Sequence, residues 1–227
     1  MKMLRSASTV YFGATAANYE RERAAADIWR LEHDTITGAL APALRPQDRV
    51  LDVAAGTGRW LDLYAQTRVR PILLDISSDM LQTARVRARE RGCEIEVVEG
   101  NILDMTSVPR CDWLISTRFF NWIPLSRIEH ILRLAADAGI ARMAFTVRTM
   151  DGTAGWRRQF GSMCYWQKKN YDVLRGRRMK GFYYLQSGRR LRRMLDRLGL
   201  QLTSEHVIER TRGDVYTLFV VSLTRTL

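Results

Sequence analysis

Short apolar segments alternate with segments of helical periodicity along most of the sequence, and this alternation limits the folds that the chain can adopt. Strands are predicted at residues 49–53, 69–75, 95–98, 113–116 and 140–147, with helices in most of the intervals between them. Strands that alternate with helices favour a parallel sheet covered by helices on both faces. Two further strands, at 200–208 and 215–223, are separated only by a short turn, so the final strand should run antiparallel. The pattern predicts an α/β fold with a mostly parallel sheet.

The chain has 227 residues, which is the length of one large domain or two small ones. No apolar run approaches the ~20 residues that a membrane-spanning helix needs, so we expect no transmembrane segment. The three cysteines are too few and too scattered for a disulfide framework or a zinc site, and no metal is expected. These features favour a protein of the reducing cytoplasm.

Positive charge is concentrated in one part of the chain. The whole sequence has 36 basic and 24 acidic residues, a formal net charge of +12. Residues 148–197 hold fourteen of the basic residues and three of the acidic ones, so this segment alone carries a net charge of +11. It also contains eight aromatic residues. Such a segment fits a nucleic acid, an acidic carrier, an anionic membrane surface, or a solvated helix face in an arginine-rich protein.

The first predicted strand runs into a turn of small residues that contains Gly56 and Gly58. Glycine lets the backbone approach a ligand closely, and the helix that follows offers free N–H groups. Leu61 stands where a dinucleotide-binding fingerprint has its third glycine, and no lysine follows Gly58 as a P-loop requires. Asp52, at the end of the strand, would repel a pyrophosphate and attract a cation. The turn therefore suits a nucleoside ligand that carries positive charge and no phosphate.

Asp75 stands at the carboxyl end of the second predicted strand, 23 residues beyond Asp52. A carboxylate at this place can accept hydrogen bonds from both hydroxyl groups of a ribose. Its alternative role is the N-cap of the following helix, but Ser77 or Ser78 can serve there. We therefore expect Asp75 to bind a ribose.

Three motifs resemble those of the class I S-adenosylmethionine-dependent methyltransferases in type, order and spacing. They read Asp52-x-x-x-Gly56-Thr57-Gly58, Asp75-Ile76-Ser77-x-x-Met80-Leu81-x-x-Ala84 and Glu99-Gly100-Asn101-Ile102. The strand pattern that carries them spans residues 48–147. The resemblance implies a Rossmann-like sheet of seven strands with the last antiparallel. It also implies S-adenosyl-L-methionine as the cofactor and in-line displacement of its methyl group.

The resemblance further implies roles for individual residues at the cofactor. Asp52 would lie near the methionine amino group, Asp75 would hold the ribose, and Asn101 would face the adenine amino group. Many family members have aspartate in place of Asn101, but the asparagine oxygen is still an acceptor. Met80 would pack near the adenine or belong to the helix core. The predicted cofactor residues are Asp52, Ala54, Gly56, Gly58, Asp75, Ile76, Met80, Asn101 and Ile102, together with Tyr19 and Arg23 of an N-terminal lid.

The lid and the loop after the fourth strand are predicted to bind the acceptor. Residues 11–23 are similar to lids of family members that methylate small molecules, although an amphipathic helix packed on the sheet fits the same pattern. Arg118 would pair with an anionic acceptor group or with the cofactor carboxylate, and Asn121 would hydrogen-bond the acceptor. The predicted acceptor residues are Tyr11, Arg118, Phe119, Asn121, Trp122 and Trp156; ordinary packing is the alternative role for the aromatic ones. No general base is identified among the three histidines.

Motifs of three related enzyme classes are absent from the sequence. The loop after the fourth strand reads Asn121-Trp122-Ile123-Pro124, without the double proline of amino-methylating nucleic-acid enzymes. No cysteine lies in the dipeptide typical of cytosine C5 methyltransferases, and the triple glycine of aminopropyl transferases is missing. The similarity of residues 11–23 to lids of small-molecule enzymes, together with the segment of net charge +11, leads us to expect a small or carrier-bound, anionic acceptor. RNA methylation through the basic segment and a non-catalytic cofactor-binding or docking module are the alternatives.

We predict a single methyltransferase domain over residues 1–227. Its parts are an N-terminal helical lid at 1–46, a cofactor-binding core at 47–147, a basic aromatic acceptor-side insertion at 148–186, and a closing helix and hairpin at 187–227. The oligomeric state is left open.

Overall fold

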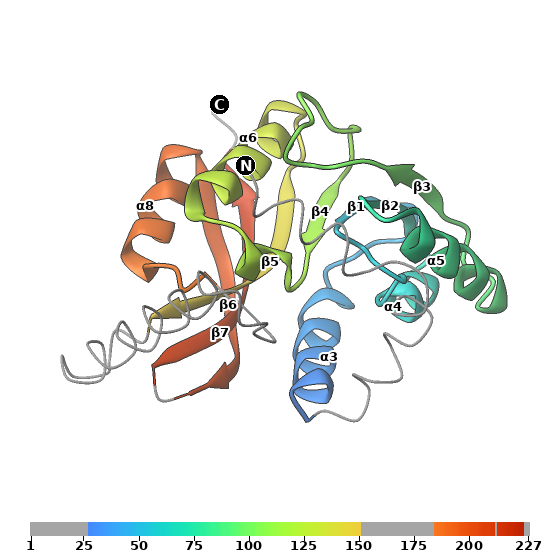
Figure 1. Cartoon of the computed structure of the whole chain (residues 1–227), viewed down its shortest axis with the longest axis horizontal. Coiled ribbons are helices and arrows are strands. Elements are labelled where there is room, and N and C mark those ends of the chain that lie inside the picture. Colours follow the sequence, from blue (N-terminus) through green and yellow to red (C-terminus); the bar gives the residue numbers. More distant parts are fainter. Residues whose placement is uncertain (1–26, 151–183, 212, 225–227) are drawn as a thin grey trace, which may run out of the picture.

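The computed structural model describes residues 27–150, 184–211 and 213–224, and these form one seven-stranded sheet flanked by helices (Figure 1). The strands are β1 Arg49–Val53, β2 Arg70–Asp75, β3 Glu96–Glu99, β4 Trp113–Ser116, β5 Arg142–Met150, β6 Leu200–Arg210 and β7 Asp214–Leu223. The helices are α3 Asp27–Leu40, α4 Leu61–Thr67, α5 Ser78–Glu90, α6 Leu125–Asp137 and α8 Gly188–Arg197, with a 3-10 turn, η1, at Phe119–Trp122.

The sheet has the strand order β3-β2-β1-β4-β5-β7-β6. The strands from β3 to β5 pair in parallel, whereas β7 pairs antiparallel with both β5 and β6. This confirms the predicted mostly parallel sheet with an antiparallel last strand. The sequence pattern did not place β7 between β5 and β6, but burial explains the order. Residues 215–221 of β7 are all buried, while β6 alternates between covered and exposed positions, as suits an edge strand.

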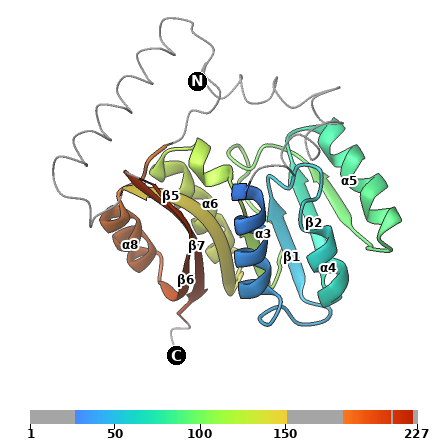
Figure 2. The ribbon, with the colours of Figure 1, turned by 90° about the horizontal axis from the view of Figure 1, so that it is seen from below.

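Helices cover both faces of the sheet. On one face, α3, α4 and α5 pack over an apolar cluster that includes Val50 of β1. On the other, α6 and α8 pack over a cluster that includes Leu51. Figure 2 shows α3 and α8 on opposite sides of β6 and β7. Because ligands of open α/β sheets bind beyond the carboxyl ends of the strands, the loops after β1, β2 and β4 are where a site is expected.

Helix boundaries follow local signals in the sequence. The Ser77 side chain caps α5 by accepting a hydrogen bond from the Met80 N–H at 3.3 Å. Of the helical lid predicted at residues 1–46, the structure describes the part from Asp27 onward, which begins with α3. The division into lid, core, insertion and closing segment stays a prediction, because much of the lid and insertion lies outside the described residues. In residues 27–150, 184–211 and 213–224, no helix is long and apolar enough to span a membrane.

Candidate functional site

The turn after β1 combines three residues with positive φ: Ala54 at 59°, Gly56 at 58° and Gly58 at 74°. A Cβ atom on Gly56 would meet no atom within 4 Å, so the backbone here borders open space. A Cβ on Gly58 would lie 2.6 Å from Leu61 Cδ1 and 3.3 Å from Ala84 Cβ. Gly58 is therefore required for close packing of α4 and α5 under the turn, whereas Gly56 leaves room for a ligand to approach the main chain.

Contacts on two sides hold this turn in place. Arg87 of α5 donates hydrogen bonds to the Thr57 carbonyl oxygen at 3.0 Å and to its Oγ1 at 3.1 Å. On the other side, the Trp60 indole N–H donates to Thr117 Oγ1, 3.0 Å away in the loop after β4. The turn is thus joined to α5 and to the loop after β4. A ligand at this edge of the sheet would lie between these two elements.

Asp75 lies at the end of β2 with both carboxylate oxygens facing backbone donors. Oδ2 accepts a hydrogen bond from the Gly56 N–H at 2.8 Å, and Oδ1 accepts one from the Ser77 N–H at 2.9 Å. Burial raises the pKa of the Asp75 carboxyl, and these backbone hydrogen bonds oppose the rise. A carboxylate offers about four acceptor positions, so Asp75 keeps capacity to accept a hydrogen bond from a ligand.

Asp52 is buried near the carboxyl end of β1, where it accepts a hydrogen bond at 2.9 Å from the Tyr64 hydroxyl of α4. Burial raises the pKa of the Asp52 carboxyl from 3.8 to about 7; the Tyr64 hydrogen bond lowers it and the nearby Asp75 charge raises it further. Because a cation nearby stabilises the charged form, this carboxyl is placed to respond to a positively charged ligand.

The loop after β3 lies beside the end of β2, because the Gly100 N–H donates to the Asp75 carbonyl oxygen at 2.9 Å. In this loop, Asn101 Oδ1 accepts a hydrogen bond from the Leu103 N–H, and Asn101 Nδ2 donates to Asp104 Oδ2 at 2.7 Å. The side chains of Met80 and Ile102 are buried, while Ile76 is 42% exposed. Ile76 is therefore an exposed apolar side chain directly after Asp75, whereas Met80 and Ile102 belong to the buried interior.

A buried ionic cluster that the sequence analysis missed lies between α3 and the loops after β1 and β4. Glu32 is fully buried, and its Oε2 accepts hydrogen bonds from Arg59 Nη1 at 2.5 Å and from Arg118 Nε at 2.6 Å. The Tyr216 hydroxyl of β7 donates to Glu32 Oε1. The Arg59 guanidinium also stacks on Trp29, 3.5 Å from the ring centroid. A signal was present in the sequence, because Glu32 shares the buried stripe of α3 with Ile36 and Leu40 at i+4 and i+8 spacing.

This cluster changes the electrostatics of the groups in it. Burial lowers the pKa of Arg59, and the Glu32 carboxylate opposes that fall. Burial and the Glu32 charge together hold the pKa of Tyr216 well above its usual value, so the phenol stays protonated. Arg118 has a left-handed backbone at φ 64°, with its N–H donating to Thr146 Oγ1 at 2.7 Å. Its side chain is 21% exposed, so the predicted acceptor residue is ion-paired inside the protein while still reaching the surface.

The remaining described acceptor residues divide into two groups. Asn121 is buried, and its Oδ1 accepts a hydrogen bond from the Arg148 N–H at 2.7 Å, which engages this oxygen in holding β5. Phe119 and Trp122 are partly buried in η1 and line the edge of the loop. Phe119 packs against the apolar cluster under α6 and α8, as the packing alternative predicted, whereas Trp122 is partly buried, and Asn121 lies inside the fold.

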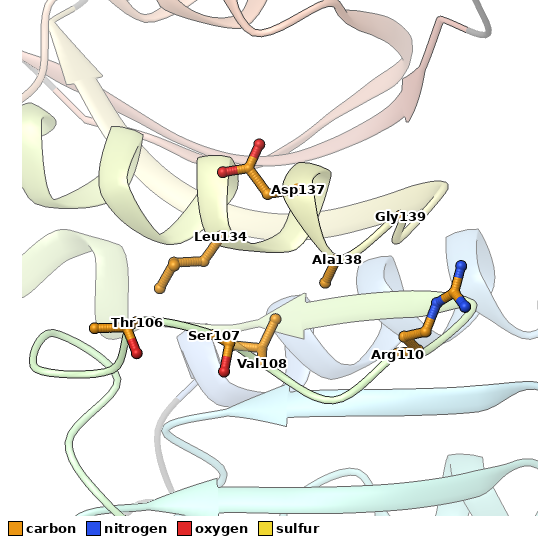
Figure 3. A pocket seen from close by; sticks show the side chains of 8 residues that line it. All are labelled: Thr106, Ser107, Val108, Arg110, Leu134, Asp137, Ala138 and Gly139. Atoms are coloured by element: carbon orange, nitrogen blue, oxygen red, sulfur yellow. The ribbon is translucent and has the colours of Figure 1, made fainter.

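Four predicted site residues fall outside the described part of the chain, namely Tyr11, Tyr19, Arg23 and Trp156. Their assignments stay predictions. A separate open hollow of about 370 Å³ lies between residues 106–110 and the last turn of α6 (Figure 3). None of the residues predicted for the site lines this hollow.

A family model described as a methyltransferase domain matches residues 50–138. The chain is 30% identical over 100 residues to a trans-aconitate 2-methyltransferase of Rhodopseudomonas palustris, an alignment that covers 43% of this chain and 37% of that protein. It is 26% identical over 164 residues to an uncharacterised methyltransferase of Mycobacterium tuberculosis, and this alignment covers 72% of this chain and 62% of that protein. The chain thus spans less than two thirds of the length of either relative.

Among solved structures, the fold is similar to a magnesium protoporphyrin IX methyltransferase from Synechocystis, crystallised with S-adenosylhomocysteine. The two share 16% sequence identity with a TM-score of 0.70, and the match covers 98% of this chain and 99% of that one. At this level of identity the likeness describes the fold.

Proposed function

Because this chain belongs to the class I S-adenosylmethionine-dependent methyltransferase family, with the methyltransferase domain at residues 50–138, we propose that it methylates a small or carrier-bound anionic acceptor. The observation that carries the proposal is the Asp75 carboxylate, held by the Gly56 and Ser77 N–H groups beside a turn with open backbone. This arrangement presents a carboxylate with remaining acceptor capacity where a ribose is expected.

Three features of the described residues fit S-adenosyl-L-methionine. Asp75 would accept hydrogen bonds from the ribose hydroxyl groups, and the main chain at Gly56 would lie against the nucleoside. Asp52, whose pKa is raised to about 7, would be stabilised as a carboxylate by the positive charge of the cofactor. Met80 and Ile76 would border the adenine. When bound, the cofactor supplies an electrophilic methyl group on a sulfonium.

The protein's own part in the reaction would be mainly positioning. Holding acceptor and cofactor in line converts a bimolecular step into an effectively unimolecular one. An acceptor that is already an anion, such as a carboxylate, has no proton to lose on methylation and so needs no general base. The loop after β4 would carry the acceptor, with Phe119 and Trp122 as apolar contacts and Arg118 as the basic group nearest the surface.

Support for an anionic acceptor comes from the arginines at this edge and from one relative. Arg59 and Arg118, from the two loops that border the cofactor edge, share the single carboxylate of Glu32, so two guanidinium groups stand against one negative charge. The relative from Rhodopseudomonas palustris carries the name of an enzyme for trans-aconitate, a small anion. RNA methylation has weaker support. Arg148, the first basic residue of the segment 148–197, pairs with Glu209 and Asp214 at 2.7 Å each, so its charge is already balanced within the protein.

The proposal is tested by incubating the purified protein and S-adenosylmethionine labelled in the methyl group with a cell extract. The extract is then separated into small-molecule, protein and RNA fractions. We expect label in the small-molecule or protein fraction, its product identified by mass spectrometry, and no label with the Asp75→Ala variant. Label confined to RNA would overturn the acceptor class, and label in no fraction would support the non-catalytic alternative.

A further inference from the structure

Helix α8 has one face buried in the core and one face covered with arginine. Leu191, Met194 and Leu195 belong to the apolar cluster under α6 and α8, which accounts for the packing of the helix. Its other positions include five arginines and one aspartate, a net charge of +4 within ten residues. All five arginines are exposed, namely Arg189, Arg190, Arg192, Arg193 and Arg197.

Only part of this charge is balanced by acidic neighbours. Arg192 pairs with Glu205 of β6 at 2.5 Å, and Arg197 pairs with Glu129 of α6 at 3.4 Å. Within the described part of the chain, no acidic side chain pairs with the other three arginines of α8. They form a continuous exposed strip, because residue 193 is four positions after 189 and three after 190, and both spacings make side chains neighbours on a helix surface.

The position of two of these arginines also opposes the stability of the helix. Arg189 and Arg190 are the second and third residues of α8, which is capped by Ser187, and this first turn holds no acidic residue. Positive charge at a helix N-terminus is unfavourable, because the helix dipole is positive there. A feature that serves neither packing nor helix stability is a candidate for an intermolecular role.

The composition of the strip distinguishes between anionic partners. A helix that lies on a membrane inserts its apolar face, but the apolar face of α8 is buried in the core. Proteins that grip single-stranded RNA stack bases on exposed aromatic side chains, and α8 contains none. A-form RNA has a major groove too narrow for side chains to read. A rigid row of arginines suits the carboxylates of an acidic protein surface.

We propose that the strip Arg189, Arg190 and Arg193 is a docking surface for an acidic protein. The start of α8 adjoins the acceptor side of the sheet, because Gln186 bridges to Thr149 near the end of β5 and donates a hydrogen bond to the Ile123 carbonyl oxygen at 3.0 Å. A protein docked on this strip would lie next to the loop after β4. The docking does not depend on the proposed methyl transfer, and it gives a carrier-bound acceptor a place to bind.

The test measures binding of a fluorescent poly-L-glutamate peptide of about 20 residues by anisotropy at about 50 mM salt, where surface electrostatics are weakly screened. The test variant is Arg189→Glu/Arg193→Glu. The control is Arg85→Glu/Arg89→Glu on α5, which reverses two exposed arginines at the same i, i+4 spacing on the other face of the sheet. Both variants change the net charge equally. New glutamates in α8 meet the helix dipole favourably at residue 189, so the test variant should fold, and the unfolding midpoint of each variant checks this.

We expect the α8 variant to weaken peptide binding by about tenfold or more and the α5 variant to change it by less than about threefold. Equal losses in the two variants would show a non-specific effect of net charge and overturn the proposal. Absence of peptide binding by the unmodified protein would overturn it as well. Tighter α8-dependent binding of an RNA oligonucleotide or of phosphatidylglycerol vesicles than of the peptide would assign the strip to that other class of partner.

Discussion

Gly56 and Asp75 are 19 residues apart in sequence and are joined by a hydrogen bond of 2.8 Å from the Gly56 N–H to the Asp75 carboxylate. This bond connects the turn after β1 to the end of β2, so the backbone at Gly56 and the carboxylate of Asp75 are held in one fixed arrangement. A ligand that uses both groups therefore meets a preorganised site, which lowers the ordering cost of binding.

The packing role of Gly58 can be separated by mutation from the strain of its left-handed backbone. Gly58→Ala should destabilise the protein by more than about 2 kcal/mol, because the new Cβ would collide with Leu61 in a left-handed backbone. Gly139→Ala is the matched control, since Gly139 has φ 75° and nothing within 4 Å of its Cβ position. It should cost only the backbone strain, about 1 kcal/mol. Urea denaturation measures both, and equal losses would refute the packing role of Gly58.

Asp52 should make stability depend on pH in a defined direction. Its folded-state pKa of about 7 lies above its ordinary value of 3.8, so the folded protein holds a proton that the unfolded chain has lost between these values. The contribution of Asp52 to stability is therefore present below about pH 4 and is lost as the pH rises to about 7.

This dependence is measured as the free energy of unfolding of the unmodified protein and of Asp52→Asn at several pH values. The amide does not titrate. The free energy of unfolding of the variant should therefore rise relative to that of the unmodified protein, by on the order of a few kcal/mol between pH 4 and 7. A difference that stays constant with pH would show that Asp52 titrates normally.

Glu32→Gln should be strongly destabilising, because it leaves the guanidinium groups of Arg59 and Arg118 without their buried counter-ion. Removing one partner of a buried ion pair costs about 3–5 kcal/mol. Glu205→Gln is the control, since its pair with Arg192 is solvent-exposed and should contribute less than about 1 kcal/mol. Chemical denaturation of the two variants gives the comparison, and similar small losses in both would mean that the Glu32 cluster is not structurally important.

Local signals were sufficient for much of the fold. Residues 49–53 and 113–116 were predicted as strands and are β1 and β4, because short apolar runs bounded by turn residues are distinctive. The cap of α5 was predicted as Ser77 or Ser78, and the structure shows that Ser77 is the residue that caps it. The insertion of β7 between β5 and β6 depends on the burial of both its faces, which only the assembled sheet reveals.

The acceptor side of the site was less predictable, because its contacts join distant parts of the chain. Glu32 meets Arg118 across 86 residues and Tyr216 across 184. Arg118 was expected to face a ligand, and nothing in its local sequence indicates an intramolecular partner on α3. Asn121 was likewise expected to bind the acceptor, whereas its oxygen holds the backbone of β5.

The central claim, a nucleoside cofactor held by Asp75, is tested most directly by calorimetric titration with S-adenosylmethionine. The unmodified protein should bind it, and Asp75→Ala should weaken binding at least about tenfold because the ribose loses its carboxylate acceptor. The control Asp137→Ala, at an exposed residue of α6, should leave affinity unchanged. Circular dichroism verifies that the variants fold. Undiminished binding by folded Asp75→Ala would contradict the ribose assignment, and absence of binding by the unmodified protein would contradict the cofactor itself.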